Sequence, residues 1–222
     1  MNRGSHYLLL IFGFFLATTS LWILGSELSG ARITTLPTSP EVATVAAQRR
    51  VQALRAALFG GLRGDLWSQL AYTYASLMWS DPKKADDALD EARHSATRAL
   101  TLGPVNASVW LFLADLGIRY GKKDPNPLEC LKMSYYTGAH EESSVALRLA
   151  VVSRVDLSVD PELERLFRRE VENVLSYRPS LRPAIVAAYA QASPQARQAI
   201  ETTARDVDPS FAKALASASL AQ

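Results

Sequence analysis

The chain has 222 residues, of which 48% are hydrophobic and 21% are charged, and its formal net charge is +2. Positive and negative side chains are interspersed, without the basic stripe or the basic and aromatic interleaving that marks nucleic-acid binding, so we expect no nucleic-acid partner. About 195 residues follow the apolar amino terminus, which is enough for one globular domain with its own core. The sequence shows no strand pattern of useful length and therefore predicts an all-α fold.

The first 26 residues contain an uncharged apolar segment. Residues 7–24 carry no charge, while Arg3 precedes them and Glu27 follows. This length crosses a bilayer if the ends snorkel or the membrane thins. A secretory signal has a shorter apolar core of about 7–15 residues, although Ser29-Gly30-Ala31 would suit cleavage. We favour a retained anchor at residues 1–26 over a signal, followed by a linker at 27–40.

The flanking charges predict the orientation of this anchor. Arg3 lies on one side of the segment and Glu27 on the other, which favours a cytoplasmic amino terminus. The chain is rich in alanine and arginine. We therefore expect a single-pass protein of a bacterial inner membrane, with residues 41–222 in the periplasm.

A helix is predicted from Glu41 to about Leu58. Ser39-Pro40-Glu41 supplies a capping residue, a proline for the first turn and a first-turn acid. The glycine-rich stretch at residues 59–65 ends this helix. A phosphate-binding loop is excluded there because no Gly-Lys-Ser/Thr follows the glycines. Asp65 is expected to cap the next helix.

The stretch from 65 to 118 contains one arrangement of large and small apolar residues twice. Residues three and four apart share a helix face, so each copy predicts a buried stripe. Small residues on the second helix let two antiparallel helices approach closely. Two antiparallel helix pairs are predicted. The first joins a helix at 65–79 with one at 82–102. The second joins a helix capped by Asn106 or Ser108 with a helix that begins at Leu128. The residues of the arrangement are Trp67, Leu70, Ala71, Tyr74, Ala92, Ala96, Ala99 and Pro104, then Trp110, Leu113 and Ala114.

This arrangement resembles the tetratricopeptide repeat (TPR), a helix-turn-helix unit that stacks into a solenoid. The resemblance covers residues 65–157 best and implies antiparallel hairpins stacked as a short TPR-like α-solenoid within residues 41–222. Trp67 and Trp110 lie 43 residues apart, whereas the family repeat has about 34 residues. Gly117 stands where the family has a tyrosine.

Further helices are predicted along the rest of the chain, at about 141–157, from 161, and at 182–192, 194–206 and 209–219. Asp160 and Ser193 are placed to cap two of them, each before a proline. The helix after Asp160 has an apolar stripe and a run of mixed charges that includes Glu170. We expect those charges to form a solvated face.

Catalytic and metal-binding patterns are not found in the sequence. His94 and His140 have no second His or Cys at ligand spacing, and no catalytic triad can be assembled. Cys130 is the single cysteine and lies among apolar helix positions, which favours a buried, inert thiol. We expect neither an enzyme nor a cofactor, a metal or a small-molecule substrate.

The TPR resemblance implies a concave face, lined by the first helix of each hairpin, that holds a peptide or a partner helix. We expect the positions on this face to be exposed, with Tyr72 and Trp79 as aromatic anchors. The helix at 41–58 or the carboxy-terminal helices could cover it instead. The predicted partner-binding residues are Asp65, Ser68, Tyr72, Trp79, Leu111, Asp115 and Ile118.

Two functions are compatible with this picture. The first is a membrane-anchored protein-protein interaction scaffold that assembles or holds a cell-envelope complex, with the anchor raising the local concentration near membrane partners. The alternative is an accessory or regulatory subunit of an enzyme of polysaccharide or cell-wall biosynthesis or export.

Overall fold

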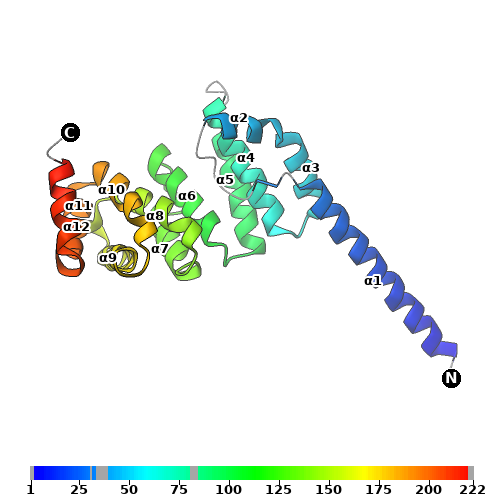
Figure 1. Ribbon diagram of the computed structural model, residues 1–222. Helices are drawn as coiled ribbons and strands as arrows, with labels where there is room; N and C mark the ends of the chain where they lie inside the picture. Colours follow the sequence, from blue (N-terminus) through cyan, green and yellow to red (C-terminus); the bar gives the residue numbers. More distant parts are fainter. Residues whose placement is uncertain (1–2, 31, 34–39, 81–84, 220–222) are drawn as a thin grey trace. The chain divides into compact units, whose positions relative to one another are not determined.

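The computed structural model describes residues 3–30, 32–33, 40–80 and 85–219, and these residues form twelve α-helices and two short 3-10 helices (Figure 1). The prediction of an all-α fold is confirmed for this part of the chain. The helices divide into two compact units, residues 1–104 and 105–222, which are described separately.

The first unit is organised around one central helix, α4. The helices α2, α3 and α5 pack against α4, and α1 packs against α3. Many side chains on more than one side of α4 are therefore buried, among them Leu66, Leu70 and Tyr72. The helices of this unit are α1 (Arg3–Ser29), α2 (Pro40–Gln48), α3 (Arg50–Gly60), α4 (Gly64–Ser80) and α5 (Ala85–Leu102).

The pairing of α4 with α5 confirms the predicted first hairpin. Ala92 and Ala96 are fully buried and Ala99 is 2% exposed, as expected for small residues that face a neighbouring helix. The approach is close: a Cβ atom added to Gly64 would lie 2.9 Å from the Ala99 carbonyl oxygen. The predicted start of the second helix, at residue 82, lies outside the described residues.

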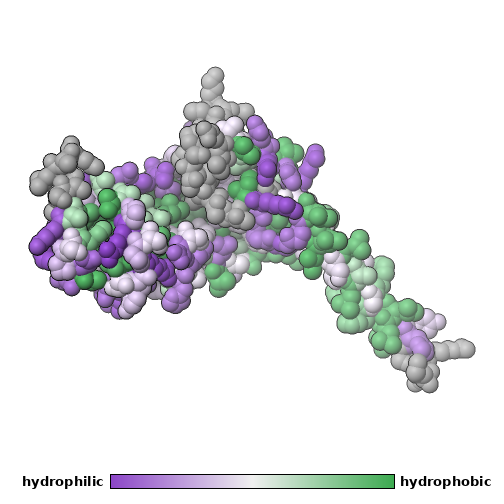
Figure 2. Space-filling model, in the orientation of Figure 1, coloured by the Kyte–Doolittle hydropathy of each residue, from purple (hydrophilic) through white to green (hydrophobic). Residues whose placement is uncertain are grey.

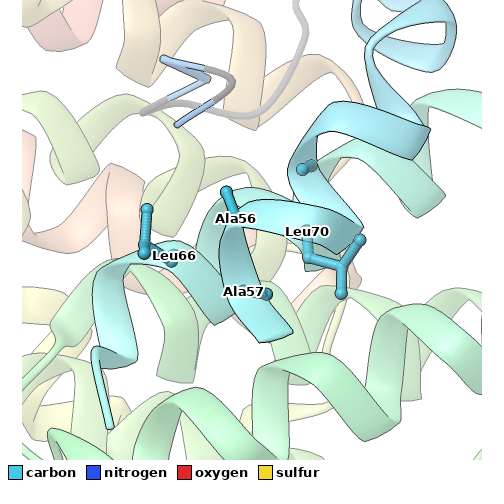
Figure 3. Packing of buried hydrophobic residues seen from close by; sticks show 5 residues of the cluster. Ala56, Ala57, Leu66 and Leu70 are labelled. Atoms are coloured by element: carbon cyan, nitrogen blue, oxygen red, sulfur yellow. The ribbon is translucent and has the colours of Figure 1, made fainter. Parts of the chain in front are cut away.

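The single helix predicted at 41–58 is wrong, because the structure has two helices there. At Arg49 the backbone amide donates to the Ala46 carbonyl oxygen, three residues back, at 3.0 Å, and α3 then begins at Arg50. The alanines of α3 at 53, 56 and 57 form a buried cluster with Leu66 and Leu70 of α4 (Figure 3). Both α2 and α3 pack on α4.

The second unit consists of successive helices that pack on near neighbours in the sequence. The contacting pairs include α6 with α7, α6 with α8, α8 with α10, α9 with α11 and α11 with α12. The elements are α6 (Ala107–Tyr120), α7 (Pro127–Thr137), α8 (Glu142–Val152), η2 (Leu157–Val159), α9 (Pro161–Tyr177), η3 (Pro179–Leu181), α10 (Arg182–Ala190), α11 (Pro194–Val207) and α12 (Pro209–Ser219).

Side-chain caps fix the starts of several of these helices. Asn106, Asp160 and Ser193 each accept a hydrogen bond from a backbone amide of the following turn, as predicted. The predicted cap at Asp65 is wrong: Asp65 lies in the first turn of α4, and its carboxylate accepts a hydrogen bond from Arg63 Nε at 3.1 Å. The helix predicted at 141–157 ends earlier, at Val152.

Gly117 has a packing reason for its place in α6. A Cβ atom there would lie 2.4 Å from Cγ of Pro127, at the start of α7, and 3.0 Å from the Lys122 carbonyl oxygen. The absence of a side chain lets the start of α7 approach α6.

Candidate functional site

The predicted partner-binding residues of α4 are mostly buried. Ser68 is 7% and Tyr72 is 3% exposed, so the prediction that they line an open face is wrong. Three helices pack around α4, including α2 and α3 from the segment that could cover the groove. Asp65 is exposed and pairs with Arg63. Trp79 belongs to the last turn of α4, and its side chain lies outside what the structure describes.

The predicted residues of α6 are also enclosed. Leu111 is 1% and Asp115 is 7% exposed, against the prediction, whereas Ile118 is partly exposed. Asp115 Oδ1 accepts a hydrogen bond from Arg119 Nε at 2.7 Å and lies 3.7 Å from Nη1 of Arg154, just after α8. Binding of a partner by any of these residues stays a prediction.

One charged cluster of the second unit was missed by the sequence reasoning. Arg148 of α8 is fully buried, and its Nε donates to Glu170 Oε1 of α9 at 2.8 Å. Tyr135 of α7 donates its hydroxyl to the other Glu170 oxygen at 3.0 Å, and the guanidinium carbon lies 4.6 Å from the centre of the Tyr135 ring. Arg148 also donates to the carbonyl oxygens of Ser134 and Gly138. This cluster ties three helices together.

Burial controls the protonation of this cluster. Burial raises the pKa of the Tyr135 phenol well above its ordinary value, with the Glu170 charge adding to the shift, so the hydroxyl stays a donor. Burial likewise raises the pKa of Glu170, while the Arg148 guanidinium and the Tyr135 hydroxyl act in the opposite direction. With its members enclosed and bonded to one another, the cluster is suited to holding the fold rather than to turning over a substrate.

A signal for this cluster was present in the sequence. Glu170 follows Leu163 by seven residues and Phe167 by three, so it falls on the apolar stripe of α9 and not on the solvated face to which it was assigned. Arg148 follows Val145 by three residues on α8 and shares its buried side in the same way. A charge on each of two apolar stripes indicates a buried pair.

Within the described residues, no group of three or more His, Cys, Asp and Glu side chains is placed to hold a metal ion. Cys130 is 1% exposed, and burial raises the pKa of its thiol to about 11, so it stays a thiol at neutral pH. The prediction of a buried thiol is confirmed.

Comparisons with protein-family models, with curated proteins and with solved structures found no match. Function is therefore inferred from the chemistry of the chain itself. The part of the first unit that bears most directly on function is the place where its apolar helix joins the other helices.

Helix α1 is long and apolar enough to cross a membrane. The most apolar 18-residue part of the stretch His6–Ser29 has a mean hydropathy of 2.1 and is not buried by the rest of the protein. Large apolar side chains project from it along most of its length, which is coloured as hydrophobic in Figure 2. The same properties occur in a signal sequence, so length and hydropathy do not separate a retained anchor from a signal.

The last turns of α1 are held by a set of polar contacts, here named the α1 junction: Trp22, Ser26, Glu27, Phe59 and Arg63. Trp22 Nε1 donates to the Phe59 carbonyl oxygen at 3.0 Å. Arg63 donates to Ser26 Oγ at 2.9 Å and to Glu27 Oε1 at 2.7 Å. Ser26 is fully buried whereas Leu28 is 70% exposed, so one side of the last turn of α1 packs against the first unit.

The chain after α1 is also tied to the first unit. Gly30 is buried, and its carbonyl oxygen accepts a hydrogen bond from Gln52 Nε2 at 3.3 Å. The Arg32 amide donates to Gln69 Oε1 of α4 at 2.8 Å. The residues around the possible cleavage site therefore contact α3 and α4.

Proposed function

We propose that this chain is a single-pass membrane protein whose helical part binds a protein partner in the cell envelope. The observation that carries the proposal is the α1 junction. A cleaved signal leaves the mature protein, so its residues have no role in the mature fold. Here Ser26 and Glu27 both bond to Arg63, and Trp22 bonds to the end of α3.

Cleavage after Ala31 would remove these contacts together. Arg63 would keep its pairing with Asp65 and would lose both Glu27 and Ser26. The buried Gly30 would be lost from the surface of α3 as well. These losses support a retained anchor over a signal sequence.

The proposed use of the helical part is protein binding through TPR-like hairpins. Packing of successive helices and the buried alanines of α5 support this. Burial of Tyr72, Leu111 and Asp115 argues against the concave face first expected. Of the predicted residues, Asp65 and Ile118 keep exposed surface, and Ile118 is the better probe because Asp65 is engaged with Arg63.

The experiment is crosslinking in cells, followed by affinity recovery of the full-length protein from detergent-extracted membranes. Three forms are compared: the wild type, Ile118→Arg, and Val186→Arg as a control at an exposed apolar position of the second unit. Circular dichroism first establishes that both variants fold.

One specific envelope protein recovered with the wild type and the control, and lost with Ile118→Arg, supports the scaffold and locates its surface. If the same protein is recovered with all three forms, the scaffold role is supported but the partner binds at a surface that does not include Ile118. Recovery of abundant bystanders alone with every form contradicts the scaffold.

A further inference from the structure

Helix α3 carries its larger apolar side chains outward and its smaller ones inward. Ala53, Ala56 and Ala57 face the core and are at most 1% exposed. On the outside, Leu58 is 63% and Phe59 is 53% exposed, and more apolar residues continue this surface. They are Val51, Leu54 and, in the turn after α3, Leu62. A helix in water has the opposite arrangement, because the larger side chains gain more from burial.

This outward surface is continuous with the apolar helix α1. A Cβ atom added to Gly25 would lie 3.2 Å from the Phe59 ring, so this ring packs against α1 while half of it remains exposed. The indole of Trp22 bonds to the backbone of the same residue. The exposed leucines on either side of Phe59 therefore lie near the end of the apolar segment.

The depth of this contact can be estimated from the length of α1. Gly25 lies about 27 Å along the helix axis from Tyr7, at ~1.5 Å per residue. The hydrocarbon core of a bilayer is about 30 Å thick. If Tyr7 marks one boundary, Phe59 lies close to the other, where Trp22 has the position of an interfacial aromatic residue.

We propose that Leu58, Phe59 and Leu62 form a lipid-contacting surface that enters the bilayer interface beside α1. The inference rests on the proposed function, because it requires α1 to remain as an anchor. The occupant is phospholipid: the surface continues that of the span and lies at the depth of its boundary. Arg55, exposed on α3, is available to the negative charge of phosphate headgroups.

The consequence is that the first unit has two membrane contacts, the span and the end of α3. Two contacts restrict rotation of the unit about α1, which a single helix followed by a flexible tether would allow. The faces that the unit presents to partners are then fixed relative to the membrane.

The test uses full-length protein in vesicles of phosphatidylcholine and phosphatidylglycerol. All variants carry Cys130→Ala, so that a fluorophore sensitive to its environment labels one introduced cysteine. The three labelled variants are Leu62→Cys, Phe15→Cys in the span, and Asp87→Cys in the first turn of α5. Quenching by lipids that carry a nitroxide at shallow or deep acyl positions is compared with quenching by aqueous iodide. We expect a blue-shifted label at position 62, quenched most by the shallow nitroxide, a label at 15 quenched most by the deep nitroxide, and a label at 87 quenched by iodide.

The three positions separate the possible failures. Iodide quenching at position 62 with lipid quenching at 15 overturns the lipid contact and leaves the anchor in place. Shielding of position 62 from both lipid and iodide means that protein covers it, which also overturns the lipid contact. Loss of lipid quenching at 15 as well overturns both the anchor and the inference.

Discussion

The buried pair of Arg148 and Glu170 allows a prediction with a definite size. Glu170→Gln keeps the shape of the side chain and removes its charge, which leaves a fully buried guanidinium without its counter-charge. Breaking a buried ion pair from one side costs about 3–5 kcal/mol, because the remaining charge stays desolvated. Hydrogen bonds from Arg148 to two backbone carbonyl oxygens remain and favour the lower end of that range.

The assay is hydrogen exchange by mass spectrometry on the full-length protein in detergent, which reports the stability of α7, α8 and α9 separately from the first unit. Each ~1.4 kcal/mol is a factor of ten in an equilibrium constant, so exchange in these helices should accelerate by roughly two to three orders of magnitude. The matched control is Glu164→Gln on the same helix, because Glu164 pairs with Arg168 at 2.8 Å with about a third of each side chain exposed. An exposed pair contributes about 0–1 kcal/mol. Equal acceleration in the two variants would refute the reasoning.

Three further predictions concern single residues. Gly64→Ala should destabilise the first unit by about 1–3 kcal/mol in urea unfolding, because its Cβ atom would meet the Ala99 carbonyl oxygen. Gly103→Ala is the control and should have little effect, because its Cβ atom would lie 3.8 Å from the same oxygen. Equal effects of the two variants would contradict the close approach at Gly64. Hydrogen bonds from the Ser210 hydroxyl and the Phe211 amide hold the pKa of Asp208 below its ordinary value. The ionised Asp208 carboxylate therefore stabilises the start of α12 above about pH 4, and this contribution is lost as the pH falls through the lowered pKa. An NMR titration that gives an ordinary pKa for Asp208 would contradict the prediction. Cys130 should resist iodoacetamide at pH 8 until urea is added, because its thiol is buried with a pKa of about 11, and rapid alkylation of the folded protein would show that it is accessible.

The sequence was sufficient for much of the helical pattern, because each feature involved is local. Asp160 and Ser193 were predicted as caps from their place before a helix, and Asn106 as one of two candidates with Ser108. The structure has Asn106, Asp160 and Ser193 in that role. The buried alanines of α5 followed from helical spacing alone. A cap or a stripe depends on neighbours within two turns, and the sequence contains those neighbours.

The predicted exposure of Tyr72 and Leu111 was wrong because residue spacing within a helix does not show how the other helices pack around it. A stripe shows which side of a helix is most apolar, but it does not show how many other helices surround it. Helix α4 is enclosed by α2, α3 and α5, so residues off its main stripe are buried too. The break at Arg49 lies between two helices that both pack on α4, and spacing within a helix does not contain such contacts.

For α3, the sequence did not show which side of the helix faces the core and which side carries the exposed leucines. Apolar residues occupy both sides of this helix in the sequence, so periodicity could not indicate which side faces the core. The structure places the alanines inside and the leucines outside, next to α1. Their meaning depends on whether α1 stays in the membrane.

The most direct test of the account is the intact mass of the protein purified from alkali-washed membranes of cells that express the full-length chain. We expect a membrane-bound protein that retains residues 3–30, which include the residues that α1 contributes to the α1 junction. A soluble protein whose chain begins at Arg32 would show that the apolar helix is a cleaved signal, and would contradict both the anchor and the lipid-contacting surface.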